Sequence, residues 1–105
     1  MSELPTRHWD DTVHPPADLT PIGSVRYRER AAVRGTVAAA RDTRWTGGPV
    51  LEVDIEDPTG SLMVAFFGRH HIAGVEPGHR VTVEGVPVRR HGHPVLMNPL
   101  LWVEP

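Results

Sequence analysis

The segment Val50-Leu51-Glu52-Val53-Asp54-Ile55-Glu56 alternates apolar and acidic side chains with a period of two residues. Successive side chains of a β-strand point to opposite faces, so this pattern predicts a strand with one buried and one acidic face. We expect Leu51, Val53 and Ile55 in the core. The next residues, Asp57-Pro58-Thr59-Gly60, have proline and glycine at positions typical of a tight turn.

Further segments rich in β-branched residues lie on both sides of this strand. We predict a first strand over about 27–40, a third over 62–67, a fourth over 80–88 and a fifth over 95–103, made irregular by Pro99. Residues 41–49 and 89–94 are predicted loops. Between the third and fourth strands, residues 69–73 are expected to make one helical turn closed by Gly74. Residues 1–21 contain four prolines and are expected to form a poorly ordered arm, in which Trp9 is the one large apolar group.

These elements predict an all-β fold, a five-stranded OB-fold Greek-key barrel over residues 22–105 with a short helical connector between strands three and four. Gly35 lies inside the long first strand. A strand shared by both halves of a small barrel must bend, and a residue without a Cβ atom permits this. An SH3-like barrel and a β-sandwich are the alternatives. The position of the connector favours the OB-fold, and five strands are few for a sandwich.

Several short motifs resemble those of a known group of proteins. They are Val33 through Val37, Asp57 through Leu62, Phe66-Phe67-Gly68, Val75 through Val81 and Val86 through Pro99. Over residues 22–103 the chain is similar to nucleic-acid-binding OB-folds of the anticodon-binding type. This group includes the wedge domain of fork-remodelling DNA helicases and small stand-alone bacterial proteins, which are the most similar in layout. The resemblance implies binding of single-stranded nucleic acid, DNA or RNA, or a supporting role beside a nucleic-acid enzyme.

Two predicted loops are candidate binding elements, because OB-folds usually hold oligonucleotides between the loops that join strands one to two and four to five. Both loops contain arginine, and the first adds a tryptophan, whose indole can stack on a base while guanidinium groups neutralise phosphates. A phenylalanine at the end of the third strand is a further stacking candidate, although such a residue is more often part of the core. The predicted nucleic-acid-binding residues are Arg41, Arg44, Trp45, Phe67, Arg89, Arg90, His91 and His93.

Two observations leave the function open. Trp45 either covers one end of the barrel or stays available to a ligand. Glu52, Asp54 and Glu56 would repel phosphates from the outer face of the second strand unless they pair with a cation such as Arg34. We therefore expect modest affinity and low sequence specificity. The alternative is a protein-interaction module that docks a partner of a nucleic-acid-processing complex.

A separate arginine-rich stretch precedes the barrel. Arg26, Arg28 and Arg30 are two residues apart, so an extended backbone would place all three on one side. They would form either a short basic strip or an exposed edge protected by charge.

Composition excludes several classes of protein. A chain of 105 residues is the size of one domain, and the absence of cysteine excludes disulfide scaffolds, thiolate zinc sites and thiol catalysis. The formal net charge is −2 and all 11 basic residues are arginine, so a strongly basic, histone-like binder is excluded. Arginine differs from lysine in that its planar fork stacks on bases and grips phosphate.

Enzymatic and metal-binding functions find no support in the sequence. The close histidine pairs, His70-His71 and His91-Gly92-His93, lack the spacing of a zinc site. There is no nucleophile-elbow sequence around Ser61 and no glycine-rich phosphate loop, so we expect no enzyme, metal or cofactor. No apolar run approaches the ~20 residues that cross a bilayer, and the N-terminus does not resemble a signal peptide. We therefore expect a cytoplasmic protein.

Overall fold

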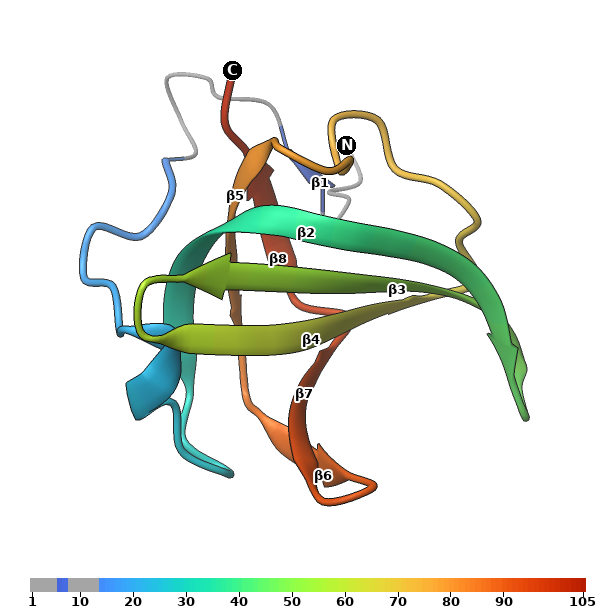
Figure 1. Cartoon of the computed structure of the whole chain (residues 1–105), viewed down its shortest axis with the longest axis horizontal. Helices are drawn as coiled ribbons and strands as arrows, with labels where there is room; N and C mark the ends of the chain where they lie inside the picture. Colours follow the sequence, from blue (N-terminus) through green and yellow to red (C-terminus); the bar gives the residue numbers. More distant parts are fainter. Residues whose placement is uncertain (1–5, 8–13) are drawn as a thin grey trace.

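The computed structural model of the protein describes residues 6–7 and 14–105, which form one curled β-sheet (Figure 1). Within these residues the strand order is β1-β8-β5-β2-β3-β4-β7-β6. The prediction of an all-β chain is confirmed. The elements are β1 (Thr6–Arg7), a 3-10 helix η1 (Ile22–Ser24), β2 (Ala31–Trp45), β3 (Gly48–Asp57), β4 (Gly60–Phe67), β5 (Arg80–Gly85), β6 (Val88–Arg90), β7 (His93–Met97) and β8 (Leu100–Val103).

The long strand β2 belongs to both halves of the sheet. Its first part, Ala31 to Thr36, pairs antiparallel with β5, and its second part, from Thr36 onward, pairs antiparallel with β3. Gly35 lies where the partner changes, and a Cβ atom there would be only 2.8 Å from the backbone oxygen of Glu56. The strand therefore turns from one half to the other at a point where only glycine fits, as the sequence predicts.

The barrel interior is filled from the predicted faces of the strands. Leu51, Val53 and Ile55 of β3 are buried, as expected. They pack with side chains of the other strands and with Ile22 of η1, in a core that also contains Val33, Val37, Leu62, Val64, Phe66, Ile72, Val75, Val81, Val83, Leu96 and Leu101. On β4 the inward set is Leu62, Val64 and Phe66, which leaves Phe67 on the outside.

The prediction of five strands is wrong, because two expected loops are paired and the last strand is interrupted. Residues 41–45 continue β2 and pair with β3 up to a turn at Thr46-Gly47. Most of the second expected loop forms the β6–β7 hairpin. The last expected strand is divided into β7 and β8 at Asn98-Pro99, where Asn98 has a φ of +48° and proline has no N–H to donate.

The predicted helical connector is also wrong. The described residues between β4 and β5 contain turns and bends but no helix. One turn is closed by a hydrogen bond from the N–H of Val75 to the carbonyl of Ile72, and both side chains are buried. A single turn does not repay the cost of helix nucleation, so burial of these two side chains determines the path of the connector.

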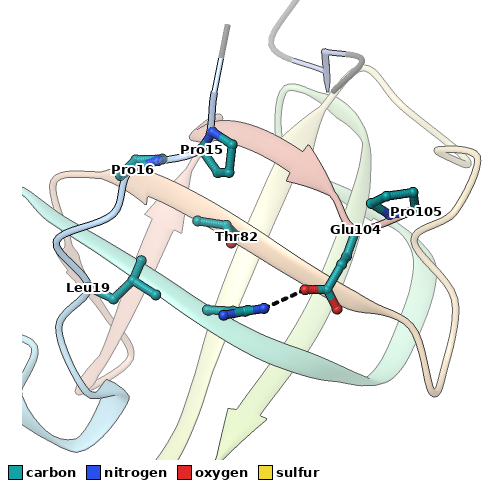
Figure 2. A pocket seen from close by; sticks show the side chains of 7 residues that line it. Pro15, Pro16, Leu19, Thr82, Glu104 and Pro105 are labelled. Carbon is teal, nitrogen blue, oxygen red and sulfur yellow. Dashed lines mark hydrogen bonds and ion pairs between the residues drawn. The ribbon is translucent and has the colours of Figure 1, made fainter. Parts of the chain in front are cut away.

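Part of the expected N-terminal arm lies along the barrel. The N–H of Thr20 donates to the carbonyl of Ala32 at 2.8 Å. Figure 2 shows Pro15, Pro16 and Leu19 beside Thr82 and Glu104, and these residues line a groove of about 330 Å³ together with Arg34 and Pro105. The guanidinium of Arg34, 2.6 Å from the Glu104 carboxylate, lowers the pKa of that group. The proposed docking of Trp9 lies outside the described residues.

Asp57 connects this N-terminal segment to the β3–β4 turn. Its carboxylate accepts hydrogen bonds from the backbone N–H groups of Ile22 at 3.0 Å, Thr59 at 2.7 Å and Gly60 at 3.2 Å. The bond from Ile22, followed by that from the Thr59 hydroxyl, lowers the pKa of Asp57. A carboxylate that is hydrogen-bonded in its charged form stabilises the fold only while it stays ionised.

We expect Gly35→Ala to lower stability by about 1–3 kcal/mol, because the added methyl must displace the backbone of Glu56. The melting temperature should fall by several degrees, measured by thermal unfolding. Gly47→Ala is the matched control, since nothing lies within 4 Å of the position that a Cβ atom would take there. That variant should be unchanged or gain about 0.4–1 kcal/mol. Equal melting temperatures for the two variants would contradict the role of Gly35.

The hydrogen bonds of Asp57 make the stability of the fold depend on pH. The folded pKa of Asp57 lies below its unfolded value of about 3.9. Its stabilisation is therefore complete above that pH and is lost as the pH falls through the folded pKa. Asp57→Asn should lower the melting temperature at pH 7 and flatten its dependence on pH below about 4. Glu56→Gln, at an exposed neighbouring acid, is the control and should leave the slope of the wild type. An equally steep acid response in Asp57→Asn would refute this assignment.

Candidate nucleic-acid interface

A second, smaller hydrophobic cluster lies on the outer face of the barrel. Its buried members are Val50 of β3, Ala65 of β4 and Val95 of β7, with Trp45 and Met63 packed against them. These side chains alternate with the core residues of their strands, and so they point away from the barrel interior. The outer face of β3 and β4 therefore has an apolar floor between the β2–β3 and β6–β7 hairpins.

The indole of Trp45 is the contact point of these two hairpins. The guanidinium carbon of Arg90, on β6, lies 3.5 Å from the centroid of the Trp45 ring. Phe67, at the end of β4, approaches from another side, with ring centroids 5.4 Å apart and planes at 64°. Phe67 is 44% exposed. One arginine and two aromatic rings from three strands thus form a single group, in which Trp45 and Arg90 are half-buried and Phe67 is exposed.

The orientation of Trp45 is fixed by Glu52. The indole N–H donates to the Glu52 carboxylate at 2.7 Å. Glu52 also accepts from Arg41, and Arg41 forms a second ion pair with Asp54 at 2.8 Å. The hydrogen bond to Asp54 is the main cause of the raised pKa of Arg41. Arg41 therefore offsets one of the two negative charges of Glu52 and Asp54, and the outer face of β3 stays acidic. The partner that we expected, Arg34, pairs with Glu104 instead.

A cavity of about 140 Å³ opens beside the aromatic pair. Trp45, Val50 and Phe67 line it, and its remaining walls come from Gly47, Gly48, Pro49 and Gly68. Glycine at three of these positions leaves the sides of the rings uncovered. Arg90 lines a different cavity, of about 230 Å³, with Asp54, Met63, His91 and His93. Trp45 thus lines a cavity that Arg90 does not line.

The β6–β7 hairpin directs its two arginines to opposite sides. His91 and Gly92 form the tip, and their φ angles of +51° and +80° are those of a tight two-residue turn. Alternation along β6 turns Arg90 toward Trp45 and Arg89 toward Tyr27, whose ring centroid is 4.2 Å from the Arg89 guanidinium carbon.

The second OB-fold domain of replication protein A from Methanococcus maripaludis, a solution NMR structure, is similar to this chain. The TM-score is 0.58 at 15% sequence identity, over 84% of this chain and 91% of that domain. The chain has an OB-fold. No protein-family model and no curated protein sequence matches it. In an OB-fold, the two hairpins described above take the places of the loops that flank the binding face.

The OB-fold brings together only part of the predicted set of residues. Trp45, Phe67 and Arg90 are in contact, and His91 and His93 line the adjoining cavity. The remaining arginines are placed differently: Arg41 is held in ion pairs with Glu52 and Asp54, Arg44 lies on the opposite face of β2, and Arg89 faces Tyr27.

The roles of Glu52, Tyr27 and the apolar floor were not predicted from the sequence. The position of Glu52 opposite Arg41 could have been inferred from the sequence. If Gly47 is taken as part of a tight hairpin turn, Arg41 lies opposite Glu52, which is the register of the structure. That register also places the indole of Trp45 near the same carboxylate.

Neither a metal site nor a membrane-spanning helix is found in the residues that the structure describes. No group of three or more histidine or acidic side chains among them is placed to hold a metal ion. No described helix is long and apolar enough to cross a membrane.

The contact between the two hairpins is open to a direct test. In a double-mutant cycle with Trp45→Leu and Arg90→Gln, we expect a coupling energy of about 0.5–1 kcal/mol, the value typical of exposed cation–π pairs. Urea unfolding supplies the four stabilities. Pairing Trp45→Leu with Arg89→Gln is the matched control and should be additive, because Arg89 faces Tyr27. Additivity in both cycles would show that the hairpins do not touch at Trp45.

Proposed function

We propose that this OB-fold binds single-stranded nucleic acid, DNA or RNA, on the outer face of β3 and β4 between the two hairpins. The observation that carries the proposal is the group formed by Trp45, Phe67 and Arg90, with an open cavity beside the two rings. Aromatic platforms next to guanidinium groups bind single strands by stacking on bases and neutralising phosphates. The OB-fold of replication protein A that resembles this chain supports the same class of ligand.

Modest affinity and low sequence specificity follow from the composition of the site. Glu52 and Asp54 retain carboxylates on the binding face, and Arg41 is engaged by both of them, so few free cations face a phosphate there. Stacking tolerates any base, because every base has a π-face. The proposal also draws on the predicted resemblance to small stand-alone bacterial OB-fold proteins. We propose that the protein is cytoplasmic and that it binds nucleic acid without catalysis or a cofactor.

We expect Phe67→Ala and Trp45→Ala each to weaken binding of a single-stranded oligomer by ~1–3 kcal/mol, because each removes a stacking ring. The measurement is fluorescence polarisation with labelled oligodeoxythymidylate and oligouridylate. Phe67→Ala is the cleaner variant, since its ring is more exposed and its removal should cost little stability. Trp45→Ala also loses packing against the outer cluster, so its binding is measured well below its melting temperature.

Leu19→Ala is the control for this experiment. Leu19 is 37% exposed and lies in the groove beside the N-terminal segment, away from the aromatic pair, so its removal should leave oligomer binding unchanged. That groove is the feature that favours the alternative function, docking of a partner protein. Failure of the wild-type protein to bind either oligomer would refute the proposed function. Loss of binding in Leu19→Ala but not in Phe67→Ala would move the site to the groove.

A further inference from the structure

The side of the β6–β7 hairpin that faces away from Trp45 carries a second arrangement of an arginine over an aromatic ring. Arg89 lies over Tyr27, and the Tyr27 hydroxyl donates to the carbonyl of Gly92 at the hairpin tip, at 3.4 Å. The next residue, Arg28, donates its backbone N–H to the carbonyl of Pro87 at 2.9 Å. The segment before β2 is therefore attached to both ends of this hairpin.

The backbone of Arg28 has an unusual conformation. Its φ is +67°, in the left-handed region that non-glycine residues seldom adopt. The prediction of an extended strip over residues 26–30 is wrong, because this segment forms a turn. The turn exposes the Arg28 side chain, and Arg28, Tyr27, Val88 and Arg89 line an open cavity of about 480 Å³.

Three exposed arginines give this region a positive charge. Among residues 14–105, Arg26, Arg28 and Arg89 have no carboxylate partner within ion-pair distance, whereas Arg30 is paired with Glu84 at 3.4 Å. An open cavity between two free guanidinium groups and a phenol ring suits an anion better than an apolar partner. A planar guanidinium fork binds phosphate by two hydrogen bonds, which makes a phosphodiester the most fitting ligand.

The side of the hairpin that faces Trp45 and the side that faces Tyr27 are opposite faces of the same strand, β6. Arg90 and Arg89 are consecutive residues of β6, and two exposed histidines follow them, His91 at the tip and His93 at the start of β7. A chain bound at Trp45 and Phe67 that passes over this tip arrives at Arg28 and Arg89. The phosphates of such a chain would meet cationic or hydrogen-bonding groups along this path.

We infer that Tyr27, Arg28 and Arg89 form a second, phosphate-binding subsite, and that a single strand held at Trp45 and Phe67 crosses the β6–β7 hairpin to reach it. Arg28 and Arg89 bind the phosphates, and Tyr27 is a positioning residue that holds the Arg89 guanidinium. This inference rests on the proposed function and extends it to the path and length of the bound strand.

Oligomer length separates the two subsites, because OB-folds occupy about 4–16 nucleotides. A labelled oligodeoxythymidylate of about 4 residues reaches only the aromatic group, and one of about 12 residues reaches both. In the double variant Arg28→Asn/Arg89→Gln, affinity for the long oligomer should fall several-fold and affinity for the short one should be unchanged. The slope of log K against log salt for the long oligomer should become shallower by about 1.4, since two phosphate contacts are lost at about 0.7 each.

Two further variants serve as controls. Asparagine replaces Arg28 in the double variant because it tolerates a positive φ. The variant Arg28→Lys/Arg89→Lys keeps both charges and should restore most of the salt slope. Arg44→Ala removes one positive charge from the far face of β2 and should leave the slope unchanged. Binding of both oligomers by the wild type with no effect of the double variant would overturn the second subsite alone. Binding of neither oligomer would overturn the proposed function and this inference together.

Discussion

One close approach of backbone to backbone determines the shape of this protein. At Gly35 the strand β2 leaves β5 and begins to pair with β3, and the absence of a Cβ atom lets the backbone of Glu56 come within contact distance. Because one strand serves both halves, its second half extends beyond the core and forms the β2–β3 hairpin (Figure 1). The end of that hairpin carries Trp45. The position of the candidate site therefore depends on the bend.

The acidic pattern of β3 has two effects that differ from simple repulsion of a polyanion. Its inward residues fill the core, and its outward carboxylates organise the proposed binding face. Glu52 fixes the indole of Trp45 by a hydrogen bond, and Asp54 shares Arg41 with it. One arginine thus pairs with two acids and offsets one of their two negative charges. The site that we propose would rely on stacking more than on net charge, which is consistent with a formal net charge of −2.

Periodicity predicted the buried faces well and the paired loops poorly. The alternation over 50–56 identified the inward side chains of β3, because burial of one face leaves a period of two in hydrophobicity. Residues 41–45 and 89–90 carry no such pattern, since these projecting ribbons are held by backbone hydrogen bonds and have little apolar packing apart from that of Trp45. The positive φ of Arg28 follows from contact with Pro87, 59 residues along the chain, and local sequence does not contain it.

Contacts between residues far apart in the sequence also explain why the candidate site was predicted only in part. The residue types that can bind a single strand are evident in the sequence, and strand pairing then divides them between two faces. In the unbound protein Arg90 already lies on the Trp45 ring, so a base that stacks there either uses the open side next to Phe67 or displaces the guanidinium. Displacement would replace the contact between Arg90 and the indole by a contact between the base and the indole, with little net gain in binding free energy. Entry beside Phe67 keeps Arg90 in place as a cation for the adjoining phosphate, and it is therefore the arrangement that the geometry favours.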